Sequence, residues 1–200
     1  RRIQASLRSN PPTQIGGRPV SAFHDRQSET GVFGPIQSET ERASRDVLVF
    51  EFGEDARVIL RPSGTEPKNK VYVELAEVPT DDEAPPTPDR IQRVEEACRC
   101  LGEDFVLEML SRVGIELPRW VLKASDMLSV ESKIDLAHRI VPELSERLKV
   151  AGLDTEQTRT WLHAQLAPMG REPIRLVEPA LNAWAQQEEP AVLNAFSVLM

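Results

Sequence analysis

The sequence has no long apolar run and very little cysteine. No stretch approaches the roughly 20 consecutive apolar residues of a membrane-spanning helix, so we expect no membrane partner. The two cysteines, Cys98 and Cys100, point to different faces of a helix, which suits neither a disulfide nor a shared metal site. We therefore expect reduced thiols and, since nothing favours secretion, a cytoplasmic protein.

The common signatures of catalysis and metal binding are also missing. His24, His138 and His163 are scattered, with no carboxylate or cysteine at ligand spacing. Neither a Gly-x-Ser-x-Gly elbow nor a Walker-type loop occurs. The sequence thus predicts no catalytic residue and no metal ligand within this chain.

Positive charge is in deficit, with 24 Lys and Arg against 32 Asp and Glu, and the imbalance is local. Residues 1–78 are neutral, so the whole net charge of −8 falls on residues 79–200. An acidic surface repels phosphate backbones, and we expect no nucleic-acid partner. A chain of 200 residues with 40% apolar content forms one large domain or two small ones.

The first half of the chain has the pattern of an antiparallel sheet covered by helices. β-Branched and aromatic residues predict strands at 47–52, 56–61 and 70–75, with a short strand at 20–24. Residues 1–8 resemble the end of a helix, and Ile15-Gly16-Gly17 a turn. A capped helix should follow Thr87, with an apolar stripe made by Ile91, Val94, Cys98, Leu101, Phe105 and Met109.

Two segments are expected to be irregular, and the second half to be helical. Residues 25–45 are polar and glycine-containing, which predicts a long loop. Residues 78–88 form a proline-rich linker, whose acids at 81–83 are better explained as a solvated charge run than as a Mg²⁺ site. Residues 114–200 predict a bundle of short helices, kinked or broken near Pro142 and interrupted at Pro179.

The turn at 61–68, Arg-Pro-Ser-Gly-Thr-Glu-Pro-Lys, concentrates groups that bind phosphate. Arg61 offers a planar fork for two phosphate oxygens, and Ser63 and Thr65 offer hydroxyl donors. Gly64 permits a positive φ, which turns successive N–H groups toward an anion. Lys68 and the following Lys70 add positive potential. The same residue types are also routine in a tight hairpin turn, so composition alone leaves both interpretations open.

This turn, followed by Val71-Tyr72, resembles the phosphate-binding loop in the C-terminal domain of the α-D-phosphohexomutases, the phosphoglucomutase/phosphomannomutase superfamily. Asn10-Pro11-Pro12, Ile15-Gly16-Gly17 and the strand pair at 47–52 and 58–60 resemble that domain in the same order. The resemblance covers residues 1–113 and not residues 114–200. We therefore expect a C-terminal domain at 1–113, including the linker, and a helical extension at 114–200.

The resemblance implies a fold and a role. The fold would be α+β, an antiparallel four-stranded sheet with two helices similar to the TATA-binding protein, followed by the all-α extension. Such enzymes interconvert sugar 1- and 6-phosphates, and the loop grips the phosphate that is not being transferred. By position, Arg61, Ser63, Gly64, Thr65 and Lys68 would hold this phosphate. The phosphoserine, the Mg²⁺ ligands and the sugar-reading loop would belong to preceding domains of a longer chain.

Several functional alternatives remain at this level. The leading one is the phosphate-binding domain of a mutase, inactive alone, with glucose phosphates as the lead substrate on family grounds. The other is a non-catalytic module that binds a phosphorylated ligand or a protein. The helical extension is expected to pack within its own bundle, with docking to the rest of the enzyme or an oligomer contact as alternatives.

Overall fold

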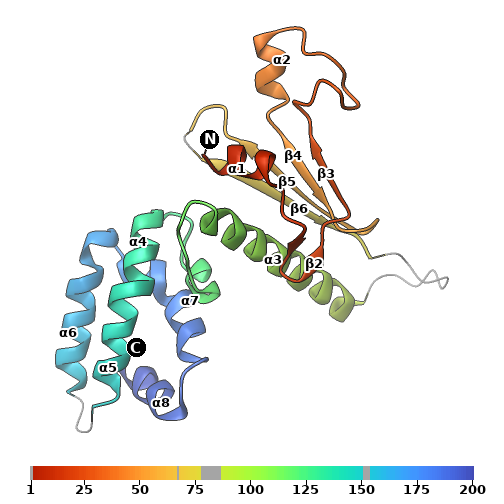
Figure 1. Ribbon diagram of the computed structural model, residues 1–200. Helices are drawn as coiled ribbons and strands as arrows, with labels where there is room; N and C mark the ends of the chain where they lie inside the picture. Colours follow the sequence, from red (N-terminus) through yellow and green to blue (C-terminus); the bar gives the residue numbers. More distant parts are fainter. Residues whose placement is uncertain (1, 67, 78–86, 151–153) are drawn as a thin grey trace. The chain divides into compact units, whose positions relative to one another are not determined.

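The computed structural model describes residues 2–66, 68–77, 87–150 and 154–200 (Figure 1). The chain divides into two compact units, Arg1–Glu116 and Leu117–Met200, each with its own buried apolar core. The linker expected at 78–88 lies outside the described residues, acidic cluster included, except for its last two positions. None of the described helices is long and apolar enough to cross a lipid bilayer.

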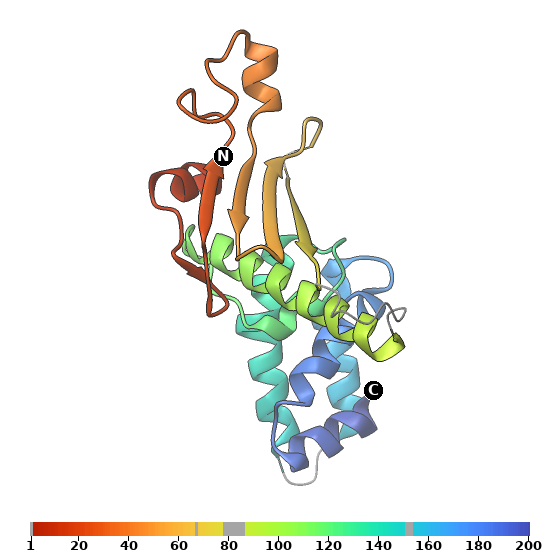
Figure 2. The same cartoon turned by 90° about the vertical axis from the view of Figure 1, so that its right-hand side faces the viewer.

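A four-stranded antiparallel sheet forms the centre of the first unit, as predicted. Its strands β3 (Ala22–Asp25), β4 (Leu48–Glu51), β5 (Ala56–Pro62) and β6 (Asn69–Leu75) lie side by side in chain order (Figure 2). In β5, buried residues alternate with more exposed ones, because successive side chains of a strand point to opposite faces. One face of the sheet therefore contributes to the core and the other carries charged residues.

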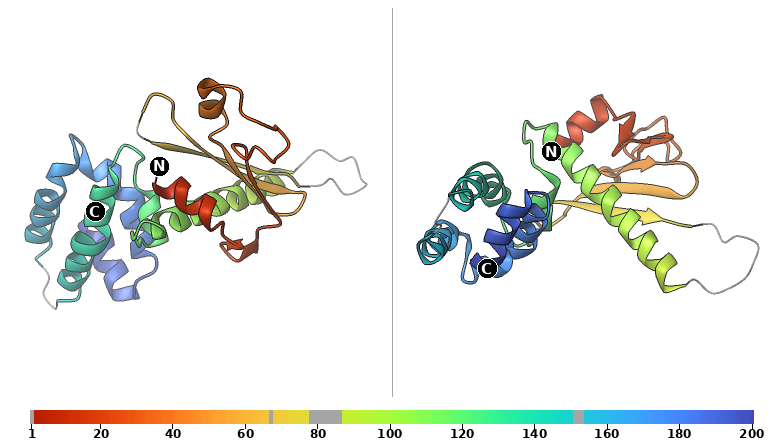
Figure 3. Two further views of the ribbon diagram at one scale, coloured as in Figure 1. Left: turned by 45° about the horizontal axis from the view of Figure 1, so that its top comes forward. Right: turned by 90° about the horizontal axis from the view of Figure 1, so that it is seen from below.

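Two helices, α1 (Arg2–Ser9) and α3 (Pro88–Ser111), pack on the apolar face (Figure 3). Leu7 from α1 and Phe105 from α3 are fully buried, and Phe105 packs on Phe50 of β4 with ring centroids 5.2 Å apart. Thr87 caps α3 as predicted, since its side chain accepts from the Arg90 N–H. The apolar stripe of α3 is buried only in its second half, and Ile91 at its start is 45% exposed.

A small hairpin of β1 (Gln14–Ile15) and β2 (Arg18–Pro19) joins α1 to the sheet. Gly16 and Gly17 have φ of 56° and 79°, the left-handed pair required by a type I′ turn, which confirms the predicted turn. A Cβ on Gly16 would lie 2.0 Å from Oδ2 of Asp104. The hairpin thus needs glycine there both for its backbone conformation and for its close approach to α3.

The loop prediction for residues 25–45 is wrong in part, because the segment contains a third helix, α2 (Glu39–Ser44). The Ser38 hydroxyl accepts from the Glu41 N–H, and the Glu41 carboxylate accepts from the Gln37 N–H, which lowers the pKa of Glu41. Arg45 donates to the carbonyls of Phe33 and Gly34. This capping and the Arg45 contacts order a segment that has little buried apolar surface.

The second unit is entirely helical in its described residues, consistent with the predicted all-α extension. Its core includes Trp120, Leu144, Leu162, Leu181 and Phe196. Its elements are η1 (Arg119–Lys123), α4 (Val130–Asp135), η2 (Leu136–Ile140), α5 (Val141–Leu148), α6 (Thr155–Leu166), η3 (Ala167–Met169), α7 (Pro173–Ala185) and α8 (Pro190–Leu199).

Proline affects these helices less than expected. Near Pro142 the chain does not break: η2 is a π-helical turn that joins α4 to α5, and the Val141 N–H donates to the Leu136 carbonyl five residues back. A wider turn of this kind accommodates the missing N–H of Pro142. Pro179 lies inside a continuous α7, so the predicted interruption is wrong. Val177, Ala180 and Leu181 are fully buried beside it, and this packing offsets the lost hydrogen bond.

Candidate functional site

The turn between β5 and β6 is a closed hairpin end. The Ser63 N–H donates to the Lys68 carbonyl at 2.8 Å, and the Lys68 N–H donates to the Glu66 carbonyl at 2.8 Å. The strands pair up to Pro62 and Asn69. Six residues lie between these two, and the hydroxyl and backbone groups of the described ones, 63–66 and 68, follow the end of the strand pairing, where they are available to a ligand.

Two cations lie opposite each other at the base of this turn. Arg61 pairs with Lys70 across the strands, and both side chains are exposed on the same face of the sheet. Within the described ranges, neither makes an ion pair or a side-chain hydrogen bond. Directly opposed like charges destabilise a sheet, so this pairing has a cost that a bound anion would relieve.

A second pair of positions on the same two strands makes the contrast clear. Arg57 lies opposite Glu74, four residues before Arg61, and its guanidinium is 2.6 Å from the Glu74 carboxylate. The sheet therefore matches a cation with an acid at one end and places two cations together at the other, beside the turn.

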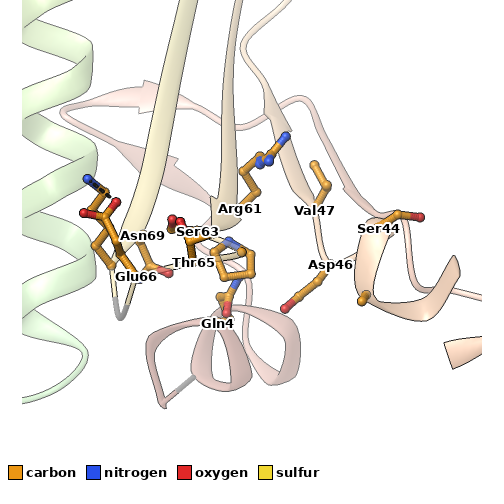
Figure 4. A pocket seen from close by; sticks show the side chains of 13 residues that line it. Gln4, Ser44, Asp46, Val47, Arg61, Ser63, Thr65, Glu66 and Asn69 are labelled. Carbon is orange, nitrogen blue, oxygen red and sulfur yellow. Dashed lines mark ion pairs between the residues drawn. The ribbon is translucent and has the colours of Figure 1, made fainter. Parts of the chain in front are cut away.

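A cavity of about 820 Å³ lies against the turn (Figure 4). The turn forms one wall, the end of α2 and the residues that lead into β4 form another, and Gln4 of α1 contributes from below in the view of Figure 4. Its lining residues are Gln4, Ala43, Ser44, Asp46, Val47, Arg61, Pro62, Ser63, Gly64, Thr65, Glu66, Lys68 and Asn69. All five predicted site residues, Arg61, Ser63, Gly64, Thr65 and Lys68, are brought together here, and their role in phosphate binding stays a prediction.

Acidic groups in this wall are matched by cations. Nζ of Lys68 is 2.7 Å from the Glu66 carboxylate, and hydrogen bonding to Lys68, with its charge, lowers the pKa of Glu66. Asp46 pairs with Arg8 of α1, which also donates to Asp25 at 2.9 Å. Burial opposes the charge of Arg8, but the bonds to Asp46 and Asp25 outweigh it and raise its pKa. Of the two opposed cations at the turn, neither makes an ion pair within the described residues, although the charge of Lys70 also helps to lower the pKa of Glu66.

Sequence reasoning missed two kinds of contributor. The sequence indicates only that Lys70 adds positive electrostatic potential near the turn, whereas the strand register places Lys70 directly opposite Arg61. Counting outward from the turn would have revealed this pairing. Gln4 and the segment from Ala43 to Val47 reach the cavity through tertiary packing, for which a single sequence carries no signal.

Binding of a metal ion requires a group of ligand side chains that lie close together. Among the described residues, no three His, Cys, Asp or Glu side chains come together in a group that could hold a metal ion.

Comparison with known proteins finds a family that part of the chain matches. Residues 36–91, which span α2, β4–β6 and the turn, match the family described as phosphoglucomutase/phosphomannomutase, C-terminal domain. A probable phosphomannomutase of Haemophilus influenzae is 40% identical over 73 residues, 36% of this chain and 13% of the relative. A phosphoglucomutase of Staphylococcus aureus strain N315 is 36% identical over 83 residues, 41% of this chain and 15% of the relative.

These matches indicate first a type of enzyme and then one particular domain of it. Residues 36–91 are similar to a domain of phosphohexose-converting enzymes. More particularly, this part of the chain matches the C-terminal domain of the phosphoglucomutase/phosphomannomutase family. The chain spans only about an eighth to a seventh of the length of these two relatives. No solved structure shows a significant match to the chain.

Proposed function

We propose that this chain contains the substrate-phosphate-binding domain of a hexose-phosphate mutase that interconverts sugar 1-phosphates and 6-phosphates. The observation that carries the proposal is the opposition of Arg61 and Lys70 at the turn, where neither cation forms an ion pair within the described residues, beside a cavity of about 820 Å³ that Arg61 lines. A phosphate dianion supplies the missing negative charge. The family match makes a sugar phosphate the natural source of that dianion.

Each group at the turn has a distinct task in this proposal. The Arg61 guanidinium pairs with two phosphate oxygens, a charge-assisted contact stronger than a neutral hydrogen bond. The hydroxyls of Ser63 and Thr65 donate to the phosphate, and the backbone at Gly64 turns its N–H inward. Lys68 adds charge at the rim. The phosphate held is the one that is not transferred, and the site must accept it from either end of the sugar.

The remaining chemistry belongs, in this proposal, to other domains of the enzyme. A phosphorylated serine and a Mg²⁺ ion would be supplied by preceding domains, and the ion would supply positive charge to stabilise the phosphoryl group during transfer. The isolated chain should therefore not turn over glucose 1-phosphate, the lead substrate. Detectable conversion of glucose 1-phosphate by the purified chain would contradict this.

The site itself is tested by titrating the ¹⁵N-labelled chain with inorganic phosphate and following its amide resonances. We expect shifts in the turn and weaker binding by roughly ten- to a hundredfold in Arg61→Ala, because a charge-assisted contact contributes about 1.5–3 kcal/mol. Arg57→Ala is the matched control, since Arg57 lies on the same face of β5 and is already paired with Glu74. Equal losses in the two variants, or no binding by the unmodified chain, would overturn the proposal.

A further inference from the structure

Gln4 is buried against the cavity and its amide nitrogen has no acceptor. The side chain is only 2% exposed, and it lines the cavity together with the turn. Among the buried side-chain nitrogen and oxygen atoms of the described residues, only Nε2 of Gln4 makes no hydrogen bond. An unsatisfied buried donor is costly and calls for an explanation, and the place of this one on the cavity wall points to a partner gained when the cavity is filled.

The position of Gln4 limits what that partner can be. Its helix α1 is anchored by Leu7, which is fully buried in the core, and by Arg8, which binds Asp25 and Asp46. The helix is therefore fixed from two sides. Figure 4 shows the Gln4 side chain projecting from α1 toward the turn. The turn therefore offers acceptors to Nε2 from across the cavity, while Asp46, which also lines it, is already bonded by Arg8.

Ser63 is the better acceptor of the two hydroxyl residues. It is half-buried, like a group facing the interior of the cavity, whereas Thr65 is exposed. A serine hydroxyl has one hydrogen to donate and two lone pairs to accept with. When it donates to a phosphate oxygen, it can accept from Gln4 at the same time, and such linked hydrogen bonds strengthen one another.

We propose that Gln4 is a positioning residue of the phosphate site: when phosphate binds, Nε2 of Gln4 donates to the hydroxyl oxygen of Ser63 and fixes its hydrogen toward the phosphate. This inference rests on the proposed phosphate binding by the turn. It adds α1 to a site otherwise built by the β5–β6 hairpin. Gln4 does not contact the ligand; it orients a residue that does.

The proposal predicts opposite effects on stability and on binding. Gln4→Met keeps the length of the side chain and removes the unpaired donor, so the Tm without phosphate should rise. The affinity for inorganic phosphate should fall about three- to tenfold, the equivalent of one lost hydrogen bond. Gln14→Met is the matched control, because Gln14 is an exposed glutamine of the same unit and does not line the cavity.

A direct readout is the side-chain NH₂ resonance of Gln4 in the ¹⁵N-labelled chain. We expect phosphate to shift this resonance and to slow its exchange with water, and Ser63→Ala to abolish both effects. In the Ser63→Ala background, Gln4→Met should weaken phosphate binding no further. Gln4→Leu, checked for folding by its amide spectrum, serves if Gln4→Met does not fold.

The outcomes separate this inference from the function on which it rests. If the unmodified chain does not bind phosphate, both are overturned. If it binds phosphate and loses affinity in Arg61→Ala, but neither Gln4→Met nor Gln4→Leu changes the affinity, only the role of Gln4 is overturned. A lower Tm with unchanged affinity would likewise reduce Gln4 to a packing residue.

Discussion

At the scale of single residues, Glu66 sets how much positive charge the turn offers. Its carboxylate holds Nζ of Lys68, and the hydrogen bond and charge of Lys68 keep the pKa of Glu66 below its usual range. Since this pKa is lowered on folding, the ion pair is complete above the ordinary glutamate pKa. It is lost only as the pH falls through the lowered value. At neutral pH, Lys68 is therefore partly neutralised beside the site.

Glu66→Gln should strengthen the binding of inorganic phosphate at pH 7 only about two- to fivefold, because an ion pair between exposed side chains is weak. The change removes a negative charge near the anion and releases Lys68 toward it. The affinity is read from the amide shifts of the turn. Glu54→Gln, in the exposed hairpin at the other end of β5, removes an equal charge and should leave the affinity unchanged. An unchanged or lower affinity in Glu66→Gln would show that Lys68 takes no part.

At the scale of elements, α1 supports the site through the ion pairs of Arg8. Arg8 on its last turn joins the helix to Asp25 at the end of β3 and to Asp46 just before β4. Asp46 lines the cavity, where an unpaired carboxylate would repel phosphate. The ion pairs of Arg8 thus have a mechanical function, because they hold α1 to the sheet, and an electrostatic function, because they neutralise Asp46.

Arg8→Met should therefore lower both the free energy of unfolding, by about 1.5–3 kcal/mol, and the affinity for phosphate. Adding Asp46→Asn separates the two functions: the double variant should regain phosphate affinity, because the carboxylate is gone, but not the lost stability. Urea unfolding and phosphate titration measure the two quantities. If the double variant binds phosphate as weakly as Arg8→Met, the effect on binding is mechanical rather than electrostatic.

Local pattern accounts for most elements of the first unit and for few of the contacts at the site. Strand alternation, the Thr87 cap and the glycine turn are encoded within a few residues, and all three were predicted correctly. Helix α2 was missed because no apolar stripe marks it; capping by Ser38 and Glu41 forms it instead. Gln4 was missed because its burial depends on a turn some sixty residues away.

In the second unit, the prolines show why helix-breaking residues predict helix ends less well than the spacing of apolar residues predicts helices. Both Pro142 and Pro179 lie in helices whose neighbouring apolar residues are buried, and packing outweighs the local cost of each proline. The periodic apolar positions were the more reliable signal, since burial of a helix face supplies most of its stability.

At the scale of the whole molecule, the two units have separate cores and separate spectroscopic probes. All three tryptophans, Trp120, Trp161 and Trp184, lie in the second unit, and the core residues of the two units do not overlap. The predicted boundary at 113/114 remains a prediction, as does any docking or oligomer role of the helical extension. The distribution of the tryptophans makes the energetic relation between the units measurable.

Leu144→Ala should destabilise the second unit without weakening the phosphate site. Leu144 is fully buried in that unit, and its truncation costs about 2–5 kcal/mol, so the urea midpoint followed by tryptophan fluorescence should fall. The affinity for phosphate should stay the same.

Conversely, Leu60→Ala in β5 should speed hydrogen exchange of the sheet amides and leave the tryptophan transition in place, because Leu60 belongs to the other core. A loss of phosphate affinity in Leu144→Ala would show that the helical unit supports the site, and so would give the extension a role in substrate binding.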